Sequence, residues 1–137
     1  MGTTETRQAA ERFVRAWERG WAAHDVDTLL ALYAEDCVHR SMPFREPHRG
    51  RAELGEYLRW SFAQERVTDV RFASPVVGPD GVAVAEFRVL SQEGGRHATL
   101  AGCVFVRFGA DGLAVETRDY WHTADGHQEP TGPLFFT

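Results

Sequence analysis

Apolar residues in the first half of the chain recur at helical spacing, with Arg and Glu on the opposite faces. The first such stripe consists of Ala10, Phe13, Val14, Trp17 and Trp21. A second, shorter stripe consists of Val26, Leu29, Leu30 and Tyr33. A third consists of Leu54, Tyr57, Leu58 and Phe62. These patterns predict three helices, the second capped by Asp25 or Asp27, with a short extended segment over Cys37 to Met42 before the third.

The second half of the chain changes to the alternation that is typical of strands. Four segments have this character: Val67 to Val77, Val82 to Leu90, His97 to Phe108 and Leu113 to His122. Turn residues such as Pro79-Asp80-Gly81 separate them, and such short connections make consecutive strands antiparallel neighbours. The order predicts one α+β domain over residues 1–137. In it, three N-terminal helices pack on a strongly curved antiparallel sheet, and the resulting cone encloses an apolar pocket.

Composition and charge narrow the class of protein. The formal net charge of -5 and the lack of a cluster of basic residues exclude a polyanion-binding protein, so we expect no nucleic-acid partner. No apolar stretch is long enough to cross a membrane, and residues 1–12 are too polar for a signal peptide. Cys37 and Cys103 are expected to be buried free thiols. A cytoplasmic protein is therefore predicted.

Asp119 is the first candidate for chemistry. Alternation along the last strand places it on an otherwise apolar face, with Leu113, Val115, Thr117 and Trp121. Loss of hydration there raises the pKa of a carboxyl group toward the range of a general acid or base. The alternative is a carboxylate that is paired with an arginine only to satisfy a buried polar group.

Two further pairs share a strand face. Glu86 and Arg88 point the same way on the strand from Val82 to Leu90, and they form either part of an active site or a structural ion pair. His39 and Ser41 alternate on the short first strand, where both side chains have hydrogen-bonding groups. A histidine without a chemical role is the alternative for His39.

Nearly the whole chain resembles the NTF2-like superfamily, in particular its SnoaL-like polyketide cyclases and limonene epoxide hydrolase. Three stretches carry the resemblance: Ala23 to Asp36, Val38 to Pro43 with Gly50-Arg51, and Arg118 to Trp121. In limonene epoxide hydrolase an Asp-Arg-Asp triad includes the last-strand aspartate, which Asp119 matches. Its other two positions fall on Glu86 and Arg88, in reversed order. The resemblance implies that His39 and Ser41 place a water molecule or a substrate oxygen.

Ketosteroid isomerase belongs to the same superfamily, but its catalytic groups do not match. The positions of its base and of its two oxyanion donors hold Ser41, Trp17 and Val104 here, so its mechanism is disfavoured. Four residues are expected to contact a substrate: Trp17, Trp121, Leu100 and Val104. Trp21 and Trp60 are predicted to be core residues.

Two functions remain open at this stage. The first is a cofactor-free biosynthetic enzyme that opens an epoxide or cyclises a polyketide-type substrate, using Asp119, Glu86, Arg88, His39 and Ser41 on a hydrophobic small molecule. The second is a non-catalytic ligand-binding or dimerisation module of the same fold. His122, Asp125 and His127 lack regular ligand spacing, so no metal is expected. The resemblance implies a homodimer through the outer sheet face, and the tail ending in Leu134-Phe135-Phe136 would cover the pocket or pack on the second subunit.

Overall fold

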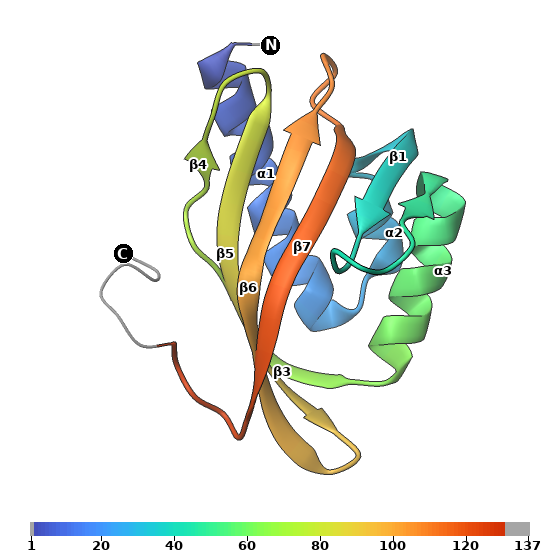
Figure 1. Cartoon of the computed structure of the whole chain (residues 1–137), viewed down its shortest axis with the longest axis vertical. Helices are drawn as coiled ribbons and strands as arrows, with labels where there is room; N and C mark the ends of the chain where they lie inside the picture. Colours follow the sequence, from blue (N-terminus) through green and yellow to red (C-terminus); the bar gives the residue numbers. More distant parts are fainter. Residues whose placement is uncertain (1, 131–137) are drawn as a thin grey trace.

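Three helices lie on one side of the sheet in this computed structural model, which describes residues 2–130 (Figure 1). They are α1 (Thr3–Ala23), α2 (Val26–Leu30) and α3 (Gly50–Ala63). Asp25 caps α2, since its side chain accepts a hydrogen bond from the backbone N–H of Thr28 at 3.2 Å. The three predicted helices are confirmed.

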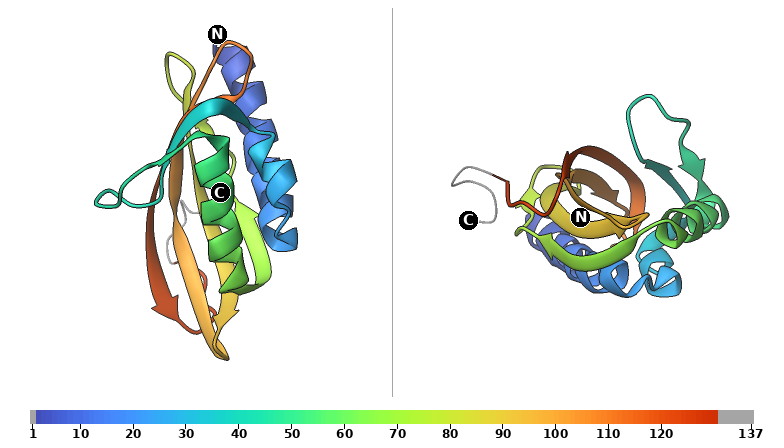
Figure 2. Two further views of the ribbon diagram at one scale, coloured as in Figure 1. Left: turned by 90° about the vertical axis from the view of Figure 1, so that its right-hand side faces the viewer. Right: turned by 90° about the horizontal axis from the view of Figure 1, so that it is seen from below.

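Within residues 2–130, seven strands form the sheet, in the order β2-β1-β7-β6-β5-β3 with β4 beside β5. Their bounds are β1 (Tyr33–Arg40), β2 (His48–Arg49), β3 (Arg66–Phe72), β4 (Val76–Val77), β5 (Val82–Glu93), β6 (Arg96–Phe108) and β7 (Ala114–Asp125). The long strands β5, β6 and β7 form an antiparallel meander, as the turn residues predict. The sheet curves around the helices in both views of Figure 2, which confirms the α+β cone.

One pairing departs from the predicted antiparallel sheet. Strand β1 pairs with β7 in parallel, with His39 opposite Thr117, so the sheet is mixed. The meander predicts only the neighbours of consecutive strands, whereas β1 and β7 are separated in the chain by β2, α3 and the strands β3 to β6. This pairing brings the side chains of β1 and β7 to the same face.

Two element boundaries also differ from the prediction. Tyr33 continues the helical spacing of the second stripe, but α2 ends at Leu30 and Tyr33 begins β1, where it is 1% exposed. The predicted strand Val67 to Val77 is split into β3 and β4. Pro75 lies in this break, and a proline has no N–H to donate to a ladder.

The core lies between the helices and the concave face of the sheet, and Figure 2 shows α1 and α3 on that side. Gly102 on β6 is opposite Trp121 on β7. A Cβ atom at Gly102 would lie 2.0 Å from the backbone oxygen of Tyr120 and 2.7 Å from Cα of Trp121. Only glycine permits the two strands to approach this closely.

Both cysteines are free thiols, Cys37 buried and Cys103 partly buried. Burial raises the pKa of both thiols. Among the described helices, none has the length and apolar character needed to cross a membrane. The prediction for Leu134-Phe135-Phe136 lies outside the described residues.

Candidate active site

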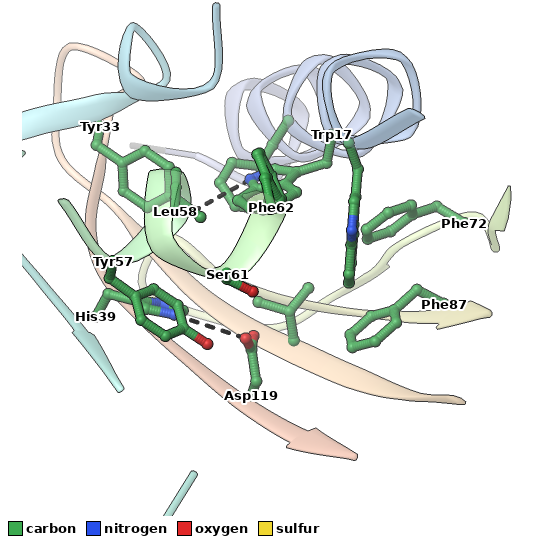
Figure 3. A pocket seen from close by; sticks show the side chains of 13 residues that line it. Trp17, Tyr33, His39, Tyr57, Leu58, Ser61, Phe62, Phe72, Phe87 and Asp119 are labelled. Atoms are coloured by element: carbon green, nitrogen blue, oxygen red, sulfur yellow. Dashed lines mark hydrogen bonds and ion pairs between the residues drawn. The ribbon is translucent and has the colours of Figure 1, made fainter. Parts of the chain in front are cut away.

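A cavity lies between α1, α3 and the concave face of the sheet, and its lining is mostly aromatic (Figure 3). It encloses about 490 Å³ of space between atoms, part of which opens to solvent. The apolar part is lined by Phe13, Trp17, Trp21, Leu58, Phe62, Phe72, Phe87 and Val104. The polar side chains of Tyr33, His39, Tyr57, Ser61 and Asp119 complete it.

Asp119 lies at the polar end of the cavity. It points inward from β7 beside Val104 of β6, as the alternation predicts. Of the surface of its side chain, 23% stays exposed, and this part faces the cavity. Desolvation by burial raises its pKa to about 8, so the carboxyl group is mainly protonated at neutral pH.

His39 contacts Asp119 from the neighbouring strand β1. Its Nε2 atom lies 3.6 Å from Oδ2 of Asp119, and its Nδ1 atom lies 2.7 Å from Oγ1 of Thr117. The residue is 4% exposed. Burial, with a smaller contribution from the charge of His48, lowers the pKa of His39 to about 3, so the imidazole is neutral.

Behind His39, a buried hydrogen bond joins β1 to helix α1. The indole Nε1–H of Trp17 donates to the hydroxyl of Tyr33 at 3.1 Å. Thr117 lies near Tyr33, and burial raises the pKa of the Tyr33 phenol. His39 is therefore held by Thr117, and Tyr33 is held by Trp17 of helix α1.

Tyr57 of α3 faces Asp119 across the mouth of the cavity, and its hydroxyl points toward the carboxyl group in Figure 3. Burial raises the pKa of Tyr57, so its hydroxyl stays protonated. Ser41 is fully buried next to Tyr57, and its hydroxyl oxygen accepts a hydrogen bond from Nη1 of Arg45 at 3.4 Å. Ser41 therefore lies behind Tyr57 and does not line the inner cavity.

An outer chamber continues from the inner cavity, and Trp21, Tyr57, Ser61, Phe87 and Asp119 line both. The outer chamber adds Leu100, Trp121 and Glu65. Glu65 accepts a hydrogen bond from Nε1 of Trp21 at 2.9 Å, and burial raises its pKa. The four predicted substrate contacts are thus divided, with Trp17 and Val104 in the inner cavity and Leu100 and Trp121 in the outer chamber.

Glu86 and Arg88 do not line the cavity, which corrects their assignment to the active site. Phe87 points into the cavity, so its two neighbours on β5 face the opposite side of the sheet. Arg88 is buried there, with Nη2 2.8 Å from Oδ2 of Asp69 and Nε 3.2 Å from Oε2 of Glu129. Glu86 is exposed. The structure therefore does not join them with Asp119 in an Asp-Arg-Asp arrangement.

Trp60 was predicted to be in the core, but 61% of its surface is exposed. The helical stripe of α3 turns Leu54, Leu58 and Phe62 inward, and Trp60 lies off that face. Trp21, the other predicted core tryptophan, packs against the core and also lines the cavity.

Sequence reasoning missed several polar residues of the site, among them Tyr33, Tyr57, Ser61, Thr117 and Glu65. Tyr33 and Tyr57 each occupy a position in an apolar helical stripe, where a hydroxyl is a weak signal. Thr117 shares the strand face of Asp119, which was a usable signal. Within residues 2–130, no group of three or more His, Cys, Asp or Glu side chains is arranged to hold a metal ion.

Comparisons with known proteins agree with this architecture. A family model described as a SnoaL-like domain matches residues 10–117. No curated protein matches the chain.

Among solved structures, RV0760c from Mycobacterium tuberculosis has a TM-score of 0.75 and 22% identity, covering 86% of this chain and 96% of that one. A computationally designed 17-OHP binder has a TM-score of 0.74 and 22% identity, covering 86% and 98%. SalBIII is described as an epoxide hydrolase/cyclase-like enzyme with a role in pyran ring formation in the polyether salinomycin. It has a TM-score of 0.76 and 16% identity, covering 88% and 98%. At these identities the structural matches establish the fold alone.

Proposed function

The chain belongs to the family of SnoaL-like domains, and on that premise we propose that it is a cofactor-independent enzyme that forms a ring in an apolar small molecule by intramolecular opening of an epoxide. One observation carries the proposal. Asp119 is a desolvated carboxyl group with a pKa of about 8, at the polar end of an otherwise aromatic cavity. A carboxylic acid that stays protonated near neutral pH is a suitable general acid.

Asp119 donates its proton to the epoxide oxygen as the carbon–oxygen bond breaks. A hydroxyl group of the same substrate forms the new carbon–oxygen bond and gives up its proton to the Asp119 carboxylate. The product is an isomer of the substrate, so no other reactant is consumed. General acid–base catalysis of this kind contributes roughly 100- to 10,000-fold to a rate.

The neighbouring side chains assist this proton transfer. His39 faces Oδ2 of Asp119 at 3.6 Å, a distance that shortens readily when a substrate closes the site. Tyr57 keeps its proton because its pKa is raised, so it can donate a hydrogen bond to a substrate oxygen. The aromatic side chains exclude water and orient an apolar substrate.

Ring formation fits these groups better than hydrolysis. Hydrolysis by the Asp-Arg-Asp arrangement needs a second carboxylate and an arginine beside Asp119, and Glu86 and Arg88 lie on the other face of the sheet. A tethered hydroxyl needs less activation because it is already held near the epoxide. SalBIII, a structural neighbour, is described as having a role in pyran ring formation, which supports this choice of reaction.

A second candidate function is ligand binding without catalysis. The inner cavity combines an apolar aromatic wall with a few polar groups at one end, which is also the character of a binding pocket. A structural neighbour is a designed binder, which supports this alternative.

The homodimer through the outer sheet face also stays a prediction. Tyr120 is 42% exposed there and packs edge-on against Phe105.

The test is a screen of apolar epoxides that carry a free hydroxyl group. Product formation is followed by chromatography, as a new peak with the same mass as the substrate but a different retention time. Asp119→Asn keeps the shape of the side chain but has no acidic proton, and we expect its kcat to fall roughly 100- to 10,000-fold. Asp125→Asn is the matched control, because Asp125 is an exposed carboxylate on the same strand. Retained turnover in a folded Asp119→Asn variant contradicts the proposal. Tight binding of these compounds with no turnover by the unaltered protein favours the ligand-binding function.

A further inference from the structure

Within residues 2–130, the carboxyl group of Glu65 has no cationic partner. Its side chain is only 11% exposed, and the basic group that approaches it, Nε2 of His24, lies 3.9 Å from Oε1. Burial lowers the pKa of His24, so this imidazole is neutral at neutral pH. A buried carboxylate is ordinarily paired with a positive charge. Glu65 therefore offers an acidic group that the described part of the chain does not neutralise.

One oxygen of Glu65 is left for a ligand. Trp21 donates its Nε1–H to Oε1 at 2.9 Å, and His24 approaches the same oxygen. Oε2 makes no hydrogen bond or ion pair with the described residues, and it is not shut off from solvent. Because Glu65 lies in the wall of the outer chamber, a molecule in that chamber can reach Oε2.

Aromatic rings form much of the wall around Glu65. The outer chamber encloses about 850 Å³ of space between atoms, part of which opens to solvent. The aromatic side chains that line it are Trp21, Tyr57, Trp60, Phe87 and Trp121. The face of such a ring attracts an organic cation that lies within about 6 Å of the ring centroid. A carboxyl group set among aromatic rings is suited to an ammonium group.

A cation already lies against this wall. The guanidinium carbon of Arg45 is 5.8 Å from the centroid of the Trp121 ring, and Nη1 of Arg45 donates to Oγ of Ser41 at 3.4 Å. Among the described residues, no ion pair joins Arg45 to Glu65. The wall thus accommodates a positive charge at Trp121, while the charge of Glu65 stays unpaired.

The other ionisable groups of the chamber make the surroundings of Glu65 acidic. Burial raises the pKa of Glu65, the hydrogen bond from Trp21 opposes this effect, and the charge of Glu93 adds to it. Glu93 lines the same chamber and is exposed. Asp119 also lines it but is mainly protonated at neutral pH. A cation bound beside Glu65 offsets both its burial and the repulsion from Glu93.

We propose that Glu65 and the aromatic wall of the outer chamber form a binding site for the ammonium group of an amine with an apolar body. Oε2 of Glu65 accepts a hydrogen bond from the ammonium group. The apolar body extends toward the inner cavity, which shares Trp21 and Phe87 with the outer chamber. That this amine is also the epoxide substrate rests on the proposed function, whereas the site itself does not.

Three probes with the same body and different ends test the site. They are phenylbutylamine, phenylbutanol and pentylbenzene, which end in an ammonium, a hydroxyl and a methyl group. Calorimetric titration at neutral pH and low salt measures their affinities. We expect the amine to bind roughly 10- to 100-fold more tightly than the other two. Equal affinities, or a preference for the alcohol, overturn the proposal.

Glu65→Gln removes the charge but keeps the shape and an acceptor for Trp21. We expect it to abolish the preference for the amine and to leave the affinity for the alcohol unchanged. Glu86→Gln is the matched control, because Glu86 is an exposed carboxylate on the other face of the sheet and its loss changes the net charge equally. A preference that persists in Glu65→Gln, or that falls equally in Glu86→Gln, overturns the role of Glu65.

If Glu65→Gln does not fold, the unaltered protein still decides. The indole N–H signal of Trp21 in a ¹H–¹⁵N spectrum, assigned by its loss in Trp21→Phe, should shift when the amine saturates the protein. An unmoved signal places the amine elsewhere and overturns the proposal. None of the probes is an epoxide, so these results do not depend on turnover. Failure of the amine site is therefore distinguishable from failure of the proposed function, which Asp119→Asn tests.

Discussion

Nε2 of His39 lies 3.6 Å from Oδ2 of Asp119, while the other nitrogen of the same ring contacts Thr117 two residues earlier on β7. One imidazole therefore spans a carboxyl group and a hydroxyl group on a single face of one strand. Both ring nitrogens contact β7 at the polar end of the cavity, so the position of the carboxyl group is coupled to that of Thr117.

The pH dependence of catalysis should follow the protonated form of Asp119. Burial raises the pKa of this group to about 8, so the acid form predominates below that pH and is lost above it. We expect kcat to be flat between about pH 6 and 7 and to decline tenfold per pH unit well above 8. The measurement is a pH–rate profile from pH 5 to 10. A rate that rises through this range would assign the reaction to the carboxylate form.

Asp119→Asn should stabilise the fold, and increasingly so at higher pH. The pKa of Asp119 is raised from 3.8 to about 8 on folding, so the folded state binds the proton more tightly. The contribution of Asp119 to stability is therefore largest below pH 4 and is lost as the pH rises toward 8. Asparagine has no such titration.

We expect Asp119→Asn to raise the free energy of unfolding by roughly 1–3 kcal/mol at pH 8, with little change at pH 4. This is less than the full pKa shift implies, because 23% of the side chain faces the cavity. Urea denaturation at both pH values measures the difference. A variant that is less stable than the unaltered protein at pH 8 would contradict the assigned environment of Asp119.

Arg88→Met should lower stability without affecting the cavity. It removes the cation that contacts Asp69 and Glu129 on the outer face, while retaining an apolar stem of similar length. Both carboxylates are at least half exposed, so we expect a loss of roughly 1–2 kcal/mol rather than that of a fully buried pair. The melting temperature and the turnover of the variant are both measured. Reduced turnover with an unchanged melting temperature would contradict this prediction and support the original assignment of Arg88 to the active site.

Gly102→Ala should disrupt the pairing of β6 and β7. The added Cβ would meet backbone atoms of Tyr120 and Trp121 at 2.0 and 2.7 Å, and backbone cannot move aside as a side chain does. We expect a loss of roughly 2–4 kcal/mol or failure to fold. Gly78→Ala is the control, since its Cβ would lie 3.5 Å from the oxygen of Val82. Equal stability of the two variants would show that the strands separate easily at Gly102.

The sequence predicts this site best where the alternation of side chains along a strand is unambiguous. Thr117, Asp119 and Trp121 lie on one face of β7, as period-two spacing requires, although a register shift beside Phe108 leaves Ala114 rather than Leu113 fully buried. For β5 the same rule correctly predicts that Glu86 and Arg88 share a face. It cannot tell which face is concave, because apolar residues lie on both sides of that strand.

The place of Tyr33 beside the cavity is not predictable from the local pattern. Tyr33 continues the spacing of Val26, Leu29 and Leu30, so periodicity assigns it to a helix. Its position in β1 depends on tertiary contacts, including the hydrogen bond with Trp17 and the pairing of β1 with β7. Non-local contacts of this kind override local spacing.

The parallel pairing of β1 with β7 has a consequence for biosynthesis on the ribosome. His39 and Thr117 are separated by 78 positions in the chain, and Asp119 lies further still toward the C-terminus. The carboxyl group and its imidazole partner therefore cannot meet until the last strand has left the exit tunnel. The proposed site is therefore assembled only after translation has delivered every other described strand.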